Sequence, residues 1–131
     1  MKLAQEVASW SKDPSTQCGA VIVDHDRHIV GTGYNGFPMH IPDCPAILNN
    51  REAKYKLVIH AERNAIDNSR GSVADCILYV THPCCVDCAQ YIIDSGIRTV
   101  AMKYDPVFAQ RWNSEEALNK FTNAGVTILK L

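Results

Sequence analysis

The spacing of apolar residues along this chain predicts both helices and strands. Leu3, Val7 and Trp10 lie four and three residues apart, which places them on one face of an amphipathic helix over 2–11. Short apolar runs with β-branched residues instead predict buried strands at 19–23, 29–34, 76–81, 98–102 and 126–131. Because only the polar residues 24–28 separate the first two strands, they predict a hairpin.

Start and stop signals predict three further helices. One begins at His60 and ends near Gly71, and a second runs from Pro83 to about Gly96. The third is capped by Ser114, with two glutamates in its first turn. The order β-β-α-β-α-β-α-β predicts an α/β fold with a central mixed sheet and helices on both faces. The chain has no internal repeat or boundary, so we expect one domain over 1–131.

The stretch 36–50 is predicted to be a long loop. It carries Pro38, Pro42 and Pro45, and it follows an Asn-Gly pair that breaks the preceding strand. Residues 51–59 then lead into the His60 segment. Long loops in compact domains are usually functional or mobile, so this one is a candidate binding segment.

Composition narrows the class of protein. Of 131 residues, 47% are hydrophobic and 21% are charged, which is ordinary for a globular domain with a real core. The net charge is −1 and there is no long basic run, which argues against a protein that grips nucleic acid. The sequence has no apolar stretch long enough for a membrane helix or a signal peptide, so we expect a cytoplasmic protein.

The six cysteines are better explained by metal or redox chemistry than by disulfides. Without a secretory signal we expect a reducing compartment, where the cluster Cys84, Cys85 and Cys88 is typical of a metal or redox site. Cys18 and Cys76 lie in strand-like runs and are expected to be plain buried cysteines.

A histidine, a glutamate and a Cys-x-x-Cys pair form the candidate active site. His60, Cys85 and Cys88 supply three zinc ligands, and a catalytic zinc site leaves its fourth position to water. Glu62, two residues beyond the histidine, can act as acid or base on that water, and the set matches the signature of zinc-dependent base deaminases. Cys85 and Cys88 lie one turn apart at a predicted helix start, so both thiolates can reach one ion.

Cys84 leaves an alternative open. On a helix its side chain points roughly 100° away from that of Cys85, so we expect that Cys84 does not bind the metal. As a fourth ligand it would instead close a structural Cys₃His site, and a third thiolate would oppose forming hydroxide on the metal. Taken alone, a Cys-x-x-Cys could also be a redox pair or half of a structural zinc site.

Residues 60–66 together with Cys85 and Cys88 resemble the cytidine/deoxycytidylate deaminase superfamily. The segments 11–20, 33–38 (Gly-Tyr-Asn-Gly-Phe-Pro), 54–60 and 95–97 are similar to those of deoxycytidylate (dCMP) deaminases. The resemblance implies a three-layer α/β/α cytidine-deaminase-like fold with five strands. This sequence departs from the pattern of dCMP deaminases at two places. Cys84 occupies the place of the usual proline, with Pro83 one residue earlier. The stretch 36–59 is also shorter than in relatives that carry a second, structural zinc, and His40 and Cys44 alone do not make that site. We expect a single zinc.

The resemblance implies hydrolysis of dCMP to dUMP and ammonia, which supplies thymidylate synthesis. Glu62 would move a proton from the zinc-bound water to N3 of the base and then to the leaving amino group. Asn35 would hold the nucleotide, the backbone of Ala61 would meet the base, and Tyr104 would lie on the pyrimidine face. Ser15 and Lys12 are candidates for the 5′-phosphate. An Asn-Gly turn, a core tyrosine and a solvated loop are the plain structural alternatives.

The family also implies regulation and assembly. Its members are typically hexamers that dCTP activates and dTTP inhibits, with Mg²⁺ on the triphosphate. The candidate effector residues are Tyr34, Asn35, Gly36, Phe37, Pro38 and Arg70. Two other functions stay open: deamination of dCTP, cytidine, cytosine or an adenosine in transfer RNA, and a zinc-stabilised binding module in which Glu62 is idle.

Overall fold

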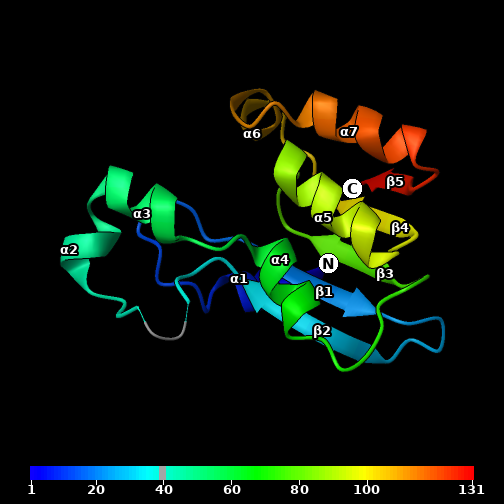
Figure 1. Ribbon diagram of the computed structural model, residues 1–131, viewed down its shortest axis with the longest axis horizontal. Helices are drawn as coiled ribbons and strands as arrows, with labels where there is room; N and C mark the ends of the chain where they lie inside the picture. Colours follow the sequence, from blue (N-terminus) through cyan, green and yellow to red (C-terminus); the bar gives the residue numbers. More distant parts are fainter. Residues whose placement is uncertain (39–40) are drawn as a thin grey trace.

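A mixed sheet of five strands runs through the molecule (Figure 1). The computed structural model describes residues 1–38 and 41–131. The strands are β1 (Gly19–Val23), β2 (Ile29–Tyr34), β3 (Ile77–Val80), β4 (Thr99–Met102) and β5 (Thr127–Lys130), in the order β2-β1-β3-β4-β5. β1 pairs antiparallel with β2 and β3, whereas β3, β4 and β5 are parallel. The predicted hairpin and mixed sheet are confirmed.

Helices cover the two faces of the sheet unequally. On one face, Ala4 and Val7 of α1 (Lys2–Ala8) pack against Val21. On the other face lies the main core, which includes Ile22 and Phe121 and is covered by α4 (Ala61–Asp67), α5 (Val86–Ser95) and α7 (Ser114–Asn123). Figure 1 shows α4 and α5 crossing in front of the strands. Strand alternation explains the division, because successive side chains point to opposite faces.

Gly33 lets α4 lie directly on β2. A Cβ at this position would come within 2.3 Å of the Ala65 nitrogen and 2.6 Å of the Ala61 carbonyl oxygen, both in the backbone of α4. Only a residue without a side chain fits such a contact. The close contact matters for the site, because α4 begins directly after His60.

The stretch 36–50 is not loop throughout, although the sequence predicts this, and a helix also forms in the stretch 51–59 that leads to His60. These stretches contain α2 (Pro45–Leu48) and α3 (Arg51–Leu57), which lie to the left of the sheet in Figure 1. Pro45 occupies the first helical position of α2, where its missing N–H costs no hydrogen bond. Helices of four and seven residues are too short to show an apolar period, which is why the pattern does not reveal them.

Two further predictions of helix position are corrected. A short helix that the sequence did not predict, α6 (Pro106–Arg111), follows β4, and Asp105 caps it by accepting a 2.8 Å hydrogen bond from the Val107 N–H. The N-cap position of the last helix is occupied by Asn113, which has a positive φ of 52° and makes no side-chain cap hydrogen bond, rather than by Ser114. Ser114 is instead the first helical residue and its buried hydroxyl has no hydrogen-bond partner within the described residues. Among the helices that the structure describes, none is both long and apolar enough to cross a bilayer.

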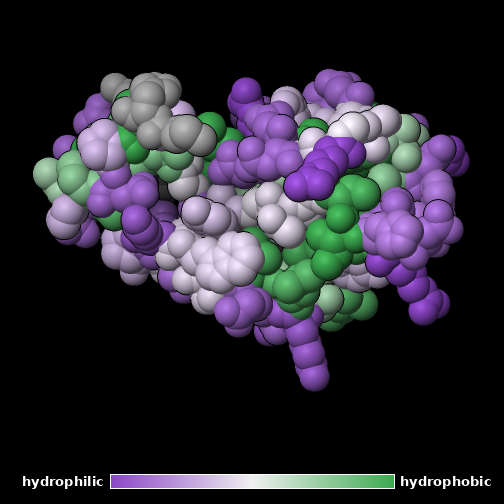
Figure 2. Space-filling view, turned by 90° about the horizontal axis from the view of Figure 1, so that it is seen from below, coloured by the Kyte–Doolittle hydropathy of each residue, from purple (hydrophilic) through white to green (hydrophobic). Residues whose placement is uncertain are grey.

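Several large hydrophobic side chains remain exposed along one edge of the sheet. Leu3 lies in α1, Trp10 follows that helix, and Ile29 and Tyr34 lie at the two ends of the edge strand β2. The ring of Trp10 meets that of Tyr34 edge-on, with centroids 6.4 Å apart. Figure 2 shows a continuous hydrophobic area, bordered by hydrophilic side chains, on the face seen from below.

Candidate metal and catalytic site

Two helix starts bring His60, Cys85 and Cys88 together. His60 is the N-cap residue of α4, Cys85 is the N-cap residue of α5, and Cys88 lies in the first turn of α5. The ligand atoms of the three side chains all lie within 4.8 Å of one another. The Nδ1 atom of His60 is 3.2 Å from the Cys88 Sγ and 3.5 Å from the Cys85 Sγ. An N-cap residue turns its side chain back over the helix start, so both helices point their first residues at one place.

This donor set fits a zinc ion. In a tetrahedral site with Zn–S near 2.3 Å and Zn–N near 2.0–2.1 Å, neighbouring ligand atoms lie about 3.5–3.8 Å apart. The His60 distances of 3.2 and 3.5 Å are close to that value. Thiolates and imidazole are also the ligands that zinc prefers. Among the described residues no fourth side chain joins the group, which is typical of a catalytic site rather than a structural one.

Hydrogen bonds among His60, Cys85 and Cys88 favour the thiolate form of Cys85. The Cys88 thiol first, and His60 after it, lower the pKa of Cys85 to about 4. The hydrogen bond between His60 and Cys85 in turn raises the pKa of His60 to about 9, and the separate hydrogen bond between Cys88 and Cys85 raises the pKa of Cys88. Binding of a metal ion would therefore displace the protons that remain on Cys88 and His60.

Glu62 lies beside this group and is almost fully buried, with 5% of its surface exposed. Burial raises the pKa of its carboxyl above the usual value. A raised pKa makes a carboxylate a stronger base, which favours the proton uptake that general acid–base catalysis requires. Glu62, His60 and Cys85 line one small cavity of about 20 Å³, and its lining is completed by Cys18, Asn35, Ala61, Pro83 and Trp112.

Cys84 lies in the main core and outside the donor group. It is 1% exposed, and burial raises the pKa of its thiol well above the usual value. A buried thiol that keeps its proton is a poor zinc ligand, because the ligand is the thiolate. The position of Cys84 agrees with the prediction that this residue does not bind the metal.

Asn35 and Ala61, two of the predicted substrate residues, lie at the catalytic cavity. The side-chain oxygen of Asn35 accepts a 2.8 Å hydrogen bond from the Cys18 N–H, and its amide nitrogen donates to the Thr16 carbonyl at 2.9 Å. The asparagine therefore ties the loop before β1 to the end of β2 and also forms part of the cavity wall. Its structural role and its proposed binding role are compatible.

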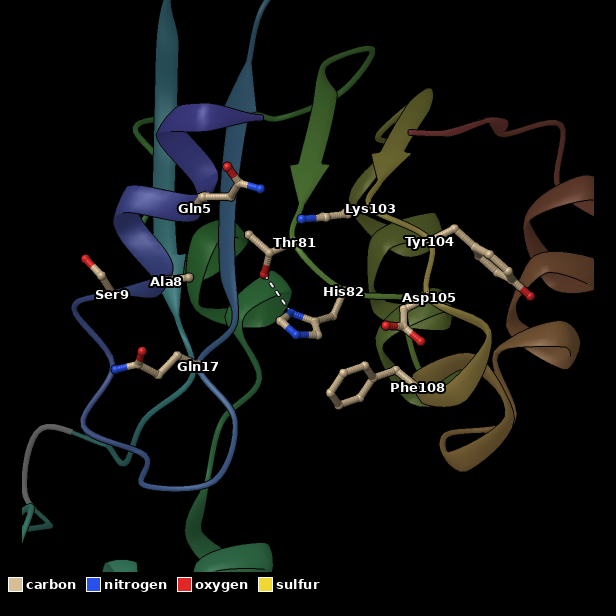
Figure 3. A pocket seen from close by; sticks show the side chains of 10 residues that line it. All are labelled: Gln5, Ala8, Ser9, Gln17, Thr81, His82, Lys103, Tyr104, Asp105 and Phe108. Atoms are coloured by element: carbon tan, nitrogen blue, oxygen red, sulfur yellow. Dashed lines mark hydrogen bonds between the residues drawn. The ribbon is translucent and has the colours of Figure 1, made fainter.

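The structure does not bring the other three substrate candidates to this cavity. Tyr104 lines a different cavity, together with His82 and Phe108 (Figure 3), and the Lys130 Nζ lies 4.2 Å from the centroid of the Tyr104 ring. Lys12 is exposed and its Nζ is 3.5 Å from the Asp43 carboxylate. The hydroxyl of Ser15 accepts a hydrogen bond from Lys54 at 3.3 Å.

Most of the predicted effector segment lines a second cavity of about 60 Å³. Its walls include Tyr34, Asn35, Gly36 and Phe37, together with Lys12, Asp13, Asp43 and Lys54. Arg70 is exposed and does not line this cavity; it lies beyond the end of α4, where its N–H donates to the Val30 carbonyl. Cys44 joins no group of metal ligands among the described residues, and His40 lies outside them.

Sequence reasoning missed an aromatic cluster of His82, Phe108 and Trp112. The centroid of Phe108 is 4.8 Å from that of His82 and 5.4 Å from that of Trp112. Two members come from α6 and the residue that ends it. The Asp105-Pro106 pair, a typical helix start, is the signal that could have predicted α6.

Comparisons with known proteins agree with this geometry. Residues 1–104 match the family model for the cytidine and deoxycytidylate deaminase zinc-binding region. An uncharacterised deaminase from the luxG 3′ region of Aliivibrio fischeri is 42% identical over 130 residues, which cover 97% of this chain and 87% of that protein. Human deoxycytidylate deaminase is 39% identical over 139 residues, which cover 99% of this chain and 76% of that protein.

A solved structure extends the similarity to the whole fold. The dCMP deaminase of cyanophage S-TIM5 superimposes with a TM-score of 0.78 at 24% identity, over 99% of this chain and 92% of that one. The predicted cytidine-deaminase-like fold is therefore confirmed.

Proposed function

This chain belongs to the cytidine and deoxycytidylate deaminase family, and we propose that it hydrolyses dCMP to dUMP and ammonia. The observation that carries the proposal is the convergence of His60, Cys85 and Cys88 beside the buried carboxyl of Glu62. The choice of dCMP is supported by relatives named deoxycytidylate deaminase, such as the human protein at 39% identity. The product dUMP would supply thymidylate synthesis.

Each residue of the site has a proposed role. His60, Cys85 and Cys88 hold one zinc ion, which when bound lowers the pKa of a water molecule toward neutrality. Glu62 accepts a proton from the attacking water and delivers it to N3 of the cytosine ring. The water oxygen bonds to C4 as a hydroxyl group, Glu62 takes the remaining proton of that hydroxyl and passes it to the amino group, and the C4–N bond breaks so that ammonia leaves. Asn35 and the backbone of Ala61 hold the base against the cavity wall.

Replacement of Glu62 by glutamine tests the reaction. The variant keeps the shape of the side chain but cannot take up a proton, so we expect one zinc per chain and a loss of turnover of about 10²–10⁴-fold or more. The matched control is Glu6→Gln on the exposed surface of α1, which should behave as wild type. An active Glu62→Gln protein with full zinc content would refute the role of Glu62.

A substrate panel separates this function from the alternatives. We expect ammonia release from dCMP, and much less from cytidine, dCTP and an RNA hairpin. X-ray absorption should find two sulfur ligands on the zinc and a light-atom solvent ligand. Three sulfur ligands and no ammonia from any substrate would indicate a zinc-stabilised binding module instead.

Regulation forms a second part of the proposal. We expect dCTP with Mg²⁺ to activate the enzyme and dTTP to inhibit it, at a site that includes Tyr34–Pro38, with Arg70 coupling subunits. Support comes from the second cavity, which Tyr34, Phe37, Lys12 and Lys54 line. Sigmoidal dCMP kinetics should become hyperbolic with dCTP and should be suppressed by dTTP. Hyperbolic kinetics that ignore both nucleotides would remove the regulatory claim.

Assembly and location complete the proposal. A homohexamer is favoured, and the exposed apolar side chains Leu3, Trp10, Ile29 and Tyr34 support contact between copies along the β2 edge. Analytical ultracentrifugation measures the oligomer directly, and a monomer at micromolar concentration would contradict it. All six cysteines are free thiols, which supports a reducing, cytoplasmic location.

A further inference from the structure

The candidate zinc ligands lie between two separate cavities. One is the catalytic cavity beside Glu62, which His60 and Cys85 line. The other, which we call the outer cavity, is lined by all three ligands and by Val58, Ile59, Arg63, Asp87 and Tyr91. No residue other than His60 and Cys85 lines both spaces, so the ligand group forms the partition between them.

The outer cavity is large enough for a metal ion with its water. Its volume is about 220 Å³, against about 20 Å³ for the catalytic cavity. A water molecule occupies about 30 Å³ in the liquid, so a divalent ion with a shell of about six waters needs roughly 180 Å³. The catalytic cavity has room for about one water. Of these two spaces, the hydrated ion fits only the outer cavity.

The outer cavity is also the one that reaches the protein surface. His60, Arg63 and Asp87 in its wall are exposed. The wall of the catalytic cavity, by contrast, consists largely of buried residues, namely Cys18, Asn35, Ala61, Glu62 and Pro83. An ion that arrives from solvent therefore meets its three ligands first from the outer side.

The charges around the outer cavity favour a cation. Asp87 lies in the first turn of α5, between the two cysteine ligands, and is the carboxylate among the described residues that line this cavity. The lining also contains Arg63, whose Nε lies 3.7 Å from the Asp67 carboxylate and whose guanidinium lies 5.1 Å from the centroid of the Tyr91 ring. The Tyr91 hydroxyl donates a hydrogen bond to the same carboxylate. The positive charge of Arg63 is therefore balanced by Asp67, while Asp87 faces the cavity beside the ligands.

We propose that zinc enters and leaves its site through the outer cavity, and that Asp87 guides the ion to the ligands. The substrate and the metal then use opposite sides of the ligand group. This inference rests on the part of the proposed function that assigns zinc to His60, Cys85 and Cys88, and it does not depend on the choice of substrate. It gives a role to a cavity that the deamination reaction does not use.

Removal of the Asp87 charge gives the first test. Zinc bound by two thiolates and a neutral imidazole has a net charge near zero, whereas the ion in transit carries its full charge. Asp87→Asn should therefore slow both uptake and release of zinc and leave the affinity for zinc nearly unchanged. We expect exchange of bound zinc for an enriched isotope, followed by mass spectrometry of the holoenzyme, to slow about three- to tenfold at low ionic strength and less at high salt.

The direction of this change separates guidance from damage. A variant with a weakened metal site loses zinc faster than wild type, whereas loss of guidance makes exchange slower. Asp94→Asn is the matched control, because Asp94 is exposed on the same helix and does not line the outer cavity. Its exchange rate should equal that of the wild-type protein.

A bound nucleotide gives the second test. In the Glu62→Gln holoenzyme, dCMP at 100 times its calorimetric dissociation constant leaves about 1% of the protein unoccupied. If zinc had to pass through the catalytic cavity, its exchange would fall in proportion to the unoccupied protein, by about 100-fold. We expect the exchange rate to level off within severalfold of the rate without nucleotide, because the outer cavity stays open.

The outcomes distinguish this inference from the proposed function. Exchange in Asp87→Asn that is as fast as in wild type, or faster, overturns the role of Asp87. Exchange that falls in proportion to the unoccupied protein overturns the outer route. A purified protein without zinc overturns the ligand assignment itself. A zinc protein that neither binds nor deaminates dCMP overturns the proposed substrate alone, and the comparison of Asp87→Asn with Asp94→Asn then decides the outer route.

Discussion

Replacing Gly33 by alanine should both destabilise the protein and misplace Glu62, the proposed catalytic residue. The strand β2 and the helix α4 are in direct backbone contact at this residue. An added Cβ would lie 2.3 Å from the Ala65 nitrogen, 2.6 Å from the Ala61 oxygen and 2.8 Å from the Asn64 carbonyl carbon. All three atoms belong to the main chain of α4, so no side-chain rotation can relieve the overlap.

The size of the effect follows from these distances. Ordinary van der Waals contact begins at 3.4 Å, so α4 would have to move away from β2 by about 1 Å. Overpacking of this kind typically costs about 1–3 kcal/mol, which is a large part of a typical stability of about 5–15 kcal/mol. Glu62 is the second residue of α4, and a displacement of about 1 Å in a catalytic group can cost about 10²-fold in rate.

Urea denaturation and ammonia release from dCMP measure the two effects separately. The urea midpoint of Gly33→Ala should fall at unchanged slope, and the rate should fall at temperatures where the variant is still folded. Gly36→Ala is the control for stability, because its Cβ would meet only the Tyr34 ring, at 3.8 Å. That variant should be neutral or stabilised by up to about 1 kcal/mol. A wild-type midpoint for Gly33→Ala would refute the packing argument, and a lower midpoint with a wild-type rate would refute the link to Glu62.

Two other substitutions test separate features of the structure. Cys84→Ala should keep one zinc per chain and most of its activity, because the thiol is buried, protonated and outside the donor group; loss of zinc on metal analysis would show that it is a ligand. Lys54→Met should lower the free energy of unfolding in urea by about 3–5 kcal/mol, since it leaves the Asp13 carboxylate buried without its cation. The Lys54 Nζ is 3.3 Å from the Asp13 Oδ1, and the two side chains are 7% and 9% exposed. Asp13→Asn should recover part of the loss, and a Lys54→Met protein as stable as wild type would show that the pair contributes nothing.

The strands could be predicted closely because their signal is local. β1 and β2 match the predicted ranges, and β3 and β5 lie within theirs. In β1 and β4, which are buried along almost their whole length, a run of apolar and β-branched residues is required, so the sequence pattern and the burial coincide. The more exposed strands β2 and β5 could be predicted from their β-branched residues instead. The candidate zinc ligands could also be predicted from local sequence, because His60 and Cys85 are N-cap residues and Cys88 lies in the first turn of the same helix as Cys85.

The candidate substrate residues were harder to predict because distant segments of the chain position them. The Tyr104 ring lies against Lys130, which is at the end of β5, and no local pattern reveals that contact. Trp112 reaches the catalytic cavity only through α6, which is too short to produce an apolar period. The predicted loop 36–50 likewise contains helix because four-residue elements depend on their surroundings more than on propensity.

Asn35 lies in the walls of both the cavity beside Glu62 and the cavity proposed to bind effectors. The residue lines the catalytic cavity together with Glu62, and it also lines the second cavity together with Lys12 and Lys54. Its side chain bonds the backbone of 16–18, and its carbonyl accepts a 2.8 Å hydrogen bond from the Ser11 hydroxyl. A ligand that shifts this asparagine in one cavity must therefore change the wall of the other. Coupling between the two spaces then needs no large rearrangement of the fold, because one buried amide belongs to both sites.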